Sequence, residues 1–281
     1  MARHTIRLLA LDIDGTLLRS DQTVSPRTRA ALDRARSQGV RLVLVTGRRY
    51  PSARRVSDEL GGGVPLVLHN GALVVEGEEV LRCRALARQT ARRAILLGRA
   101  SGVEPVLHCG ARAEGRLLVE RAVRPSRIVA YYLERARGDV FVVADLLAAV
   151  ETEDPIQVMY GGAREEMDAL ETPLRAGLMG VARIERTVYP RAGVVLLDVL
   201  DPGVGKAKAL AFLQERWGIT AEETLAIGDN WNDREMVMAA GYGFIMGNAD
   251  PELLALGQKA LPTNDEDGVA WAIEEHVLGR V

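Results

Sequence analysis

The sequence LLALDIDGT, residues 8–16, joins a short apolar run to two acidic residues and a glycine. Four consecutive apolar residues predict a strand that is buried on both faces, as strands of a parallel sheet are. Since side chains two residues apart on an extended segment point the same way, Asp12 and Asp14 are expected to face one site. Gly15 permits a tight turn that frees backbone N–H groups to bind an anion.

Four later apolar runs end in the same manner, with a polar residue or a glycine directly after the run. They are residues 42–45 before Thr46, 66–68 before His69 and Asn70, 225–227 before Gly228 and Asp229, and 244–246 before Gly247 and Asn248. Helices are predicted between the runs, at about 26–38, 52–60, 206–217 and 233–240, each followed by a glycine that stops it. The first of these helices has Ser25 as its N-cap and Pro26 in its first turn.

This alternation of strands and helices predicts the α/β class, with a doubly wound, Rossmann-like parallel sheet as the core. In such sheets ligands bind beyond the carboxyl ends of the strands, so the polar residues that end the five runs are expected to meet. The middle of the chain has apolar runs whose polar ends repeat no motif, and it predicts an inserted α+β domain. We expect residues 1–82 and 200–281 to form the core and residues 83–199 to form the inserted domain.

Composition argues against several classes of protein. Lys and Arg number 36 and Asp and Glu number 38, for a net charge of −2, so the basic footprint of a nucleic-acid-binding protein is missing. No apolar run approaches the roughly 18 residues that cross a bilayer, and no secretory signal is expected. Cys83 and Cys109 form no metal-type cluster and are expected to be reduced, with no role assigned. We therefore expect a cytoplasmic protein with neither nucleic-acid nor membrane partners; the oligomeric state is not readable.

Two further motifs suit phosphate binding. Thr46-Gly47-Arg48 follows the second strand, where a hydroxyl and backbone N–H groups can hold a phosphate oxygen; alone, it fits a threonine that caps the next helix about as well. Lys206 begins a helix after PGVG, residues 202–205, in a chain that has only two other lysines. A lysine at this helix start is placed where a cation facing a phosphate is wanted.

The sequence GDNWND, residues 228–233, puts Asp229 and Asp233 at another strand end. The alternative for Asp233 is an acidic residue that only complements the dipole of the following helix. Together with Asp12 and Asp14, the pair makes four carboxylates at one crevice. Such a cluster repels itself unless a hard cation neutralises it, and oxygen ligands point to Mg²⁺.

In their order along the chain, these four motifs resemble the four motifs of haloacid dehalogenase superfamily phosphatases. Other stretches resemble the Cof-type subgroup, which carries a type-2 cap: NGA at 70–72, PGVGK at 202–206, MGNA at 246–249 and NDEDGV at 264–269. By this resemblance, residues 83–199 correspond to the cap in placement and length. The chain departs from the subgroup at Ala207, usually glycine, and Gly205, often serine, and both changes leave the lysine in place.

The resemblance implies a role for each matching residue. Asp12 is implied as the nucleophile, and Asp14 as the general acid that protonates the leaving oxygen and then activates water. Mg²⁺ is implied to bind Asp12, the backbone oxygen of Asp14 and Asp229, with Asp233 bracing the site. Phosphate contacts are implied for Gly15, Thr46, Gly47, Arg48, Asn70, Lys206 and Asn232.

The reaction implied by the resemblance is Mg²⁺-dependent hydrolysis of a small phosphorylated metabolite, a sugar phosphate or a phosphorylated cofactor, through an aspartyl-phosphate. Asp14 argues against a true dehalogenase, which lacks an acid at this position. Two alternatives stay open: a phosphomutase of the same superfamily, and a non-catalytic binding protein on the same fold. The substrate itself is not determined, because the cap is expected to select it.

Overall fold

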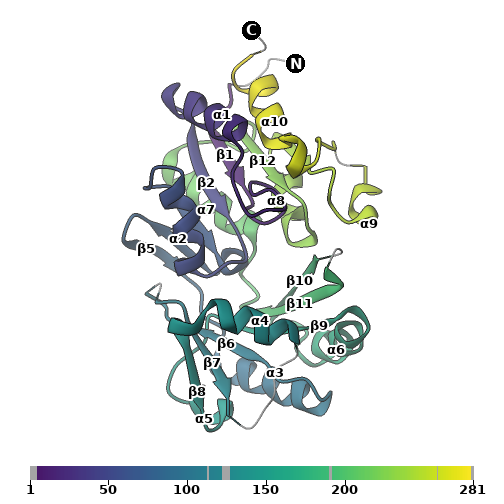
Figure 1. Ribbon diagram of the computed structural model, residues 1–281. Coiled ribbons are helices and arrows are strands. Elements are labelled where there is room, and N and C mark those ends of the chain that lie inside the picture. The colour runs from purple at the N-terminus through teal and green to yellow at the C-terminus, as the bar shows by residue number, and fades with distance from the viewer. Residues whose placement is uncertain (1–4, 113, 122–126, 190–191, 258, 280–281) are drawn as a thin grey trace. The chain divides into compact units, whose positions relative to one another are not determined.

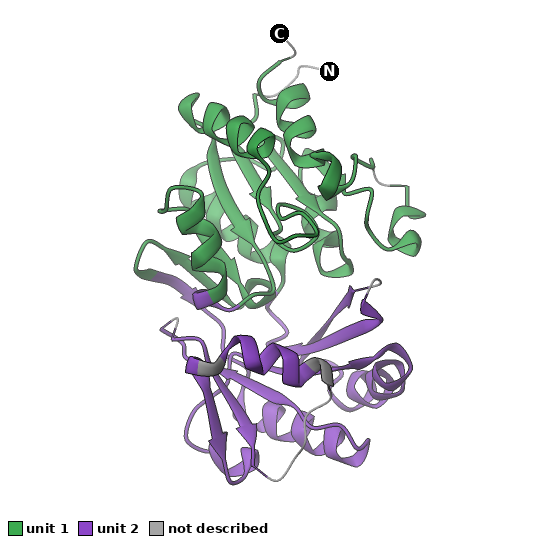
Figure 2. Cartoon of the chain, in the orientation of Figure 1, with its two compact units in different colours: residues 1–48, 52–79, 205–281 green, residues 49–51, 80–204 purple. Residues whose placement is uncertain are grey.

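The computed structural model describes residues 5–112, 114–121, 127–189, 192–257 and 259–279. The chain forms two compact units, which Figure 2 distinguishes by colour. Unit 1 contains residues 1–48, 52–79 and 205–281, and unit 2 contains residues 49–51 and 80–204. The functional division into a core, 1–82 with 200–281, and a cap, 83–199, stays a prediction.

Unit 1 is built on six strands of a seven-stranded sheet with the strand order β13-β12-β1-β2-β3-β4-β5, and β5 belongs to unit 2 from its second residue on. The strands are β1 (Leu8–Leu11), β2 (Arg41–Val45), β3 (Leu66–Leu68), β4 (Leu73–Glu76), β5 (Glu79–Cys83), β12 (Thr224–Gly228) and β13 (Tyr242–Ile245). The five strands predicted from apolar runs correspond to β1, β2, β3, β12 and β13, and each neighbouring pair among them is parallel. All four residues of β1 are fully buried, so the predicted parallel core is confirmed.

One edge of this sheet differs from the expected parallel arrangement. β4 runs antiparallel to β3, with Leu66 opposite Val75. Only residues 69–72 join the two strands, whereas a parallel crossover needs a dozen residues or more. The short connection therefore folds back as an antiparallel pair, which the sequence prediction did not include.

Helices and short turns connect the strands of unit 1. They are α1 (Pro26–Ser37), α2 (Tyr50–Glu59), η1 (His69–Gly71), α7 (Lys206–Trp217), η4 (Trp231–Asp233), α8 (Arg234–Ala239), α9 (Pro251–Leu254), η5 (Asn264–Glu266) and α10 (Gly268–His276). Ser25 caps α1 as predicted, because its Oγ accepts a hydrogen bond from the N–H of Thr28 at 3.0 Å. α7 begins at Lys206 and ends before Gly218, also as predicted. Gly218 itself has a left-handed backbone conformation. α1 packs against α10, as Figure 1 shows, and α7 packs against α8.

The strand order places a topological switch point between β1 and β12. From β1 the chain moves outward through β2 and β3 on one side, and it later returns to β12 and β13 on the other side. The direction of winding therefore reverses between β1 and β12, which is where open α/β sheets bind ligands. Asp12 and Asp229 stand directly after these two strands, and the N–H of Asp12 donates to the carbonyl of Ile227 at 3.0 Å.

Unit 2 contains a second sheet, with the strand order β10-β11-β9-β6-β7-β8. Its elements are α3 (Arg88–Ala100), β6 (Val106–Cys109), β7 (Arg116–Glu120), α4 (Arg127–Arg135), η2 (Arg137–Asp139), β8 (Val140–Val143), α5 (Leu146–Ala149), β9 (Gln157–Ala163), α6 (Arg164–Gly177), β10 (Arg183–Tyr189) and β11 (Val194–Leu200). Consecutive residues of β9 serve opposite faces: Met159 joins the apolar cluster of Val129 on α4, and the Tyr160 hydroxyl donates to the carbonyl of Ala94 on α3 at 2.7 Å. Helices therefore cover both faces of a mostly antiparallel sheet, in keeping with the predicted α+β character.

Among the described residues, no helix has both the length and the apolar character that a membrane crossing requires.

Candidate active site

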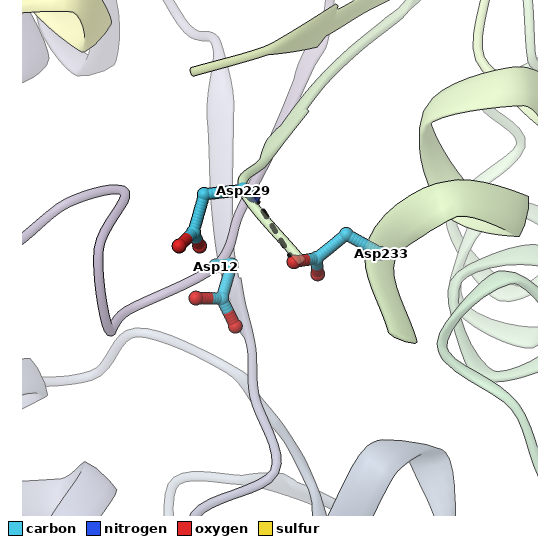
Figure 3. A group of neighbouring side chains, drawn as sticks. All are labelled: Asp12, Asp229 and Asp233. Atoms are coloured by element: carbon cyan, nitrogen blue, oxygen red, sulfur yellow. Dashed lines mark hydrogen bonds between the residues drawn. The ribbon is translucent and has the colours of Figure 1, made fainter. Parts of the chain in front are cut away.

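Three carboxylates meet at the switch point of the unit 1 sheet. Asp12, Asp229 and Asp233 each offer an oxygen, and these oxygens lie within 4.8 Å of one another. Figure 3 shows the side chains of Asp12 and Asp229 next to each other, with Asp233 reaching toward the backbone of Asp229 from its helical turn. Residues that are 217 or more positions apart in sequence are therefore joined by the topology predicted from the strand ends.

Lys206 supplies the positive charge of this cluster. Its Nζ donates to Asp12 Oδ1 and to Asp233 Oδ1, at 2.6 Å in both cases. Only 2% of Lys206 is exposed, so the ammonium lies in a buried setting where its attraction to the carboxylates is weakly screened. The first residue of α7 thus lies at the carboxyl end of β1, next to Asp12, and its contact with a phosphate stays a prediction.

Asp233 is fully buried and uses both of its oxygens. Oδ1 accepts from Lys206, while Oδ2 accepts from the backbone N–H of Asp229 at 3.2 Å and of Asn230 at 3.1 Å. The contact with the N–H of Asn230 is part of a capping box at the start of η4. The alternative that Asp233 acts only at a helix start is wrong, because its Oδ1 also accepts from Lys206. Asp233 therefore fixes the loop that carries Asp229 and orients Lys206 at the same time.

The electrostatics of the cluster favour a cation. Burial raises the pKa of Asp12 to about 7 although Lys206 opposes the rise, and the charges of Asp233 and Asp14 add to it. Burial, followed by repulsion from Asp12 and Asp233, also raises the pKa of Asp229 well above its ordinary value. Burial alone would lower the pKa of Lys206, but the two carboxylates it contacts raise it, so the lysine stays charged.

The loop after β1 packs directly against Asp229. Gly15 has φ +76°, and a Cβ built on it would lie 2.2 Å from Asp229 Oδ2. Glycine is therefore required here for two reasons, the left-handed backbone and the close approach. The neighbouring Thr16 donates from Oγ1 to Asp229 Oδ1 at 3.0 Å, so this loop also orients the carboxylate.

Asp14 is not one of the three clustered carboxylates, and its hydrogen-bond partner is Arg48. Arg48 Nε donates to Asp14 Oδ2 at 2.7 Å and Nη2 donates to Asp14 Oδ1 at 2.6 Å, which is a bidentate pair. Asp12 and Asp14 were expected to face one site because side chains two residues apart on an extended chain point the same way. Instead the chain turns after Asp12, with the N–H of Leu18 bonded to the carbonyl of Ile13 at 2.9 Å, so strand alternation does not set the direction of Asp14.

The threonine motif closes a turn next to this pair. Thr46 Oγ1 accepts from the N–H of Arg48 at 3.1 Å, and α2 begins only at Tyr50. Thr46 is therefore not the N-cap of that helix, which removes the competing structural interpretation. The carbonyl of Thr46 accepts from the N–H of Asn70 at 3.1 Å, so the ends of β2 and β3 are joined.

Asn70 and Asn232, two of the residues predicted to contact phosphate, form a hydrogen-bonded amide pair. Asn232 Nδ2 donates to Asn70 Oδ1 at 2.8 Å, and both residues are buried. A Cβ on Gly47 would approach Asn70 Oδ1 to 3.1 Å, so a small residue suits this position. The structure thus brings the predicted residues together in unit 1 in three linked sets: the acidic cluster with Lys206 and Gly15, the Asp14–Arg48 pair with Thr46, and the Asn70–Asn232 pair with Gly47.

Sequence reasoning assigned no role to two residues that the geometry ties to the site. Thr16 follows Gly15 directly, and the sequence pattern does not indicate its contact with Asp229. Asn248 donates to the carbonyl of Gly15 at 2.8 Å. The rule applied to Asp12, that polar residues directly after buried strands converge, also points to Asn248 two residues beyond the last strand end of the prediction.

The donor set fits a hard divalent cation. Carboxylate oxygens are the ligands that such ions prefer, and the two carboxylates with raised pKa values are destabilised as anions until a positive charge approaches them. Asp233 has both oxygens engaged by N–H and ammonium donors. Asp12 and Asp229 are therefore better placed than Asp233 to bind a metal ion directly.

Comparison with known proteins assigns the chain to a family. Residues 9–273 match the model of the haloacid dehalogenase-like hydrolases, and the chain belongs to that family. A putative phosphatase of Bacillus subtilis (strain 168), YxeH, is 30% identical over 98% of this chain and 99% of its own. An HMP-PP phosphatase of Klebsiella pneumoniae (strain 342) is 30% identical over 89% of this chain and 87% of its own.

A solved structure agrees with the fold as well. The crystal structure of a haloacid dehalogenase-like hydrolase from Bacteroides thetaiotaomicron has a TM-score of 0.79 and 29% identity, covering 96% of this chain and 99% of that chain. The resemblance drawn from the four motifs is thus confirmed, and with it the expectation of a phosphatase.

Proposed function

We propose that this protein is a Mg²⁺-dependent phosphomonoester hydrolase that acts on a small phosphorylated metabolite through a phosphorylated Asp12. One observation carries the proposal: a buried carboxylate after the first strand lies 2.6 Å from a buried lysine, beside a second carboxylate of raised pKa. A nucleophile and a cation in this arrangement suit phosphoryl transfer, in which alignment and charge neutralisation supply most of the catalysis.

The metal ion would be held by Asp12, Asp229 and the backbone oxygen of Asp14, with Asp233 bracing the loop and the lysine. When bound, Mg²⁺ supplies charge neutralisation for the transferring phosphoryl group. The three-carboxylate group and the raised pKa values of Asp12 and Asp229 support this assignment.

The covalent steps use residues of the chain. An Asp12 carboxylate oxygen attacks phosphorus, the bond from phosphorus to the ester oxygen breaks, and Asp14 gives a proton to the departing oxygen. Asp14 then takes a proton from water, whose oxygen attacks the phosphorus of the aspartyl-phosphate and releases Asp12 and inorganic phosphate. Lys206 and Thr46 would contact the phosphoryl oxygens, and Arg48 would orient Asp14 between the two proton transfers.

Substrate choice belongs to the inserted segment in this proposal. The HMP-PP phosphatase relative acts on a small phosphorylated compound, and the same class of substrate is proposed for this chain. Residues 83–199 would form the cap that recognises the leaving group. Exchanging this segment for the corresponding segment of that relative tests the point: the ranking of phosphate esters should follow the donor of the segment. A ranking that stays with the recipient core would reject the cap as the selector.

The reaction itself is tested by hydrolysis of p-nitrophenyl phosphate with and without Mg²⁺. The wild-type protein should release free phosphate only with the metal, and Asp12→Asn should remove the activity because the attacking charge is gone. Asp33→Asn, an exposed aspartate on α1, is the matched control and should keep full activity. Activity retained in Asp12→Asn would reject the nucleophile assignment. Transfer of labelled phosphate between positions of one sugar, without release, would instead favour the phosphomutase.

A further inference from the structure

Two asparagines outside the proposed machinery hold the loop that follows β1. Asn248 Nδ2 donates to the carbonyl of Gly15 at 2.8 Å, and Asn264 Nδ2 donates to the carbonyl of Leu18 at 2.8 Å. The backbone N–H of Asn264 donates to Asn248 Oδ1 at 2.9 Å. The two asparagines are thus linked to each other and to Gly15 and Leu18 of one five-residue segment, 14–18.

The asparagines are themselves firmly placed. The N–H of Leu261 donates to the carbonyl of Ile245 at 2.8 Å, and Ile245 also bridges Ala260, so residues 259–261 run alongside β13. Asn264 then opens η5, a turn closed by the capping box of Thr263 and Glu266. Asn264 is 8% exposed, so its hydrogen bond to the loop is largely shielded from water.

The peptide that Asn248 holds lies between two functional residues. The peptide bond between Gly15 and Thr16 is planar and trans, so the Gly15 carbonyl and the Thr16 N–H point in opposite directions. A hydrogen bond that holds the carbonyl therefore also holds the N–H. Thr16 contacts Asp229 through its hydroxyl, and Asp14 precedes Gly15 directly. A rotation of this single peptide would therefore move both the backbone donor of the loop and the side chain that orients Asp229.

The next contacts along the chain, just beyond the loop, are an exposed hydrogen bond and a partly exposed ion pair. Ser20 Oγ donates to Asp265 Oδ2 at 2.6 Å, and Arg19 Nη2 donates to Asp267 Oδ1 at 2.7 Å. Exposed ion pairs and hydrogen bonds restrain a loop weakly because water competes for both partners. The amides of Asn264, which is buried, and of Asn248, which is half-buried, are the contacts suited to hold the end of the loop next to the acidic cluster.

We propose that Asn248 and Asn264 are positioning residues that set the orientation of the loop 14–18 against Asp12 and Asp229. The inference rests on the proposed function of that site and extends it to two residues of the C-terminal part of the chain. Asn248 acts through the Gly15 carbonyl, and Asn264 acts through Leu18 and through Asn248. Neither asparagine takes part in the proposed bond-making steps.

The kinetic test compares Asn248→Ala, Asn248→Asp and Asn264→Asp with wild type on p-nitrophenyl phosphate and Mg²⁺. Asn248→Asp keeps the side-chain length and the acceptor for Asn264, and it replaces the donor to Gly15 by a carboxylate oxygen that repels the carbonyl. This variant covers the case in which Asn248→Ala fails to fold. We expect kcat to fall roughly 10- to 100-fold in each variant, as for a misplaced catalytic group, with KM within about threefold of wild type. Gln214→Ala is the matched control.

Gln214 is a partly buried amide on α7 that donates one hydrogen bond, at 2.8 Å to Thr224 Oγ1, away from the loop. Its loss should lower the melting temperature as the asparagine variants do, while kcat stays at the wild-type value. Unchanged kcat in all three asparagine variants, or a loss of kcat in Gln214→Ala of equal size, would overturn the positioning role.

Hydrogen exchange provides a readout that does not depend on activity. Peptides that cover residues 13–18 should exchange faster in Asn248→Asp than in wild type, and at the wild-type rate in Gln214→Ala. If the wild-type protein hydrolyses no phosphate ester while hydrogen exchange at residues 13–18 is still faster in Asn248→Asp, the proposed function fails and the role of Asn248 in holding the loop stands. Unchanged exchange in an active wild-type background refutes the inference and leaves the proposed function intact.

Discussion

Lys206 Nζ lies 2.6 Å from Asp12 Oδ1 in a buried setting, and it reaches Asp233 at the same distance, so one cation serves two carboxylates. Taking such charges out of water is costly, and their mutual attraction offsets that cost only while all partners are present. The stability of the metal-free protein should therefore depend on Lys206 and on pH in a linked way.

Replacing Lys206 by methionine should lower the free energy of unfolding by about 3–5 kcal/mol near pH 8, because two buried carboxylates lose their counter-charge. The folded-state pKa of Asp12 is already about 7, above its ordinary value of 3.8. As pH rises from 3.8 to about 7, the unfolded chain releases this proton while the folded protein keeps it, so the stability that Asp12 contributes is lost over this pH range. Removing the lysine raises that pKa further, which makes the deficit small at pH 5 and large at pH 8. Urea unfolding at the two pH values measures it.

Lys208→Met is the control for this experiment, since Lys208 is an exposed lysine on the same helix. It should change stability little at either pH. A deficit in Lys206→Met that is the same at pH 5 and pH 8 would contradict the shared-cation account.

Metal binding should weaken as pH falls below about 7. A proton and a cation compete for the Asp12 carboxylate, whose pKa is about 7, and Asp229 also has a raised pKa. Each pH unit below the pKa should lower Mg²⁺ affinity about tenfold for one competing proton, and more steeply where both carboxylates are protonated. Calorimetric titration with Mg²⁺ at pH 6, 7 and 8 measures this dependence, and an affinity that is level from pH 6 to 8 would exclude Asp12 as a ligand.

Gly15→Ala separates backbone strain from crowding of the acidic site. The Cβ would meet Asp229 Oδ2 at 2.2 Å, so we expect Mg²⁺ affinity and activity to drop at least tenfold. Gly218→Ala has a similar positive φ, +61°, with open space around the Cβ. It should lose roughly 1–2 kcal/mol of stability through strain alone and keep its metal affinity. Equal Mg²⁺ affinities in the two variants would show that the contact with Asp229 has no consequence for the site.

Asp14→Asn should lower kcat by about 10²-fold or more, because an amide neither donates the proton to the leaving oxygen nor activates water. Its backbone oxygen is unchanged, so the affinity for Mg²⁺ should stay within about threefold of wild type. Steady-state kinetics and calorimetry on the same preparation measure the two quantities. Wild-type turnover in this variant would assign the acid to another residue.

Much of the core could be predicted because its elements carry local patterns. The apolar run of β1 predicted a fully buried parallel strand, and the Ser25-Pro26 pair predicted the start of α1 to the residue. The antiparallel β3–β4 pair escaped prediction because an apolar run alone does not give strand direction. Direction there follows from the length of the connection, which is clear only once both strands are known.

The site was predictable as a set of residues and less so as a set of contacts. Strand ends predicted that Asp12 and Asp229 would meet, and the position of Lys206 at a helix start predicted a cation facing the same site. The Arg48–Asp14 pair was not predicted, because it depends on a turn after Asp12 that strand alternation does not describe. The hydrogen bonds of Asn248 were missed for a related reason: the sequence gives its place in the chain and says nothing about which carbonyl it reaches.

A crystal structure with beryllofluoride and Mg²⁺ can show whether Asp12 is the group that becomes phosphorylated. Beryllofluoride forms a stable mimic of an aspartyl-phosphate on the attacking carboxylate. The account predicts beryllium bonded to an oxygen of Asp12, fluorine atoms contacted by Lys206 and Thr46, and the metal between Asp12 and Asp229. A beryllofluoride group bonded to Asp14, Asp229 or any other residue, with Asp12 unmodified, would contradict it.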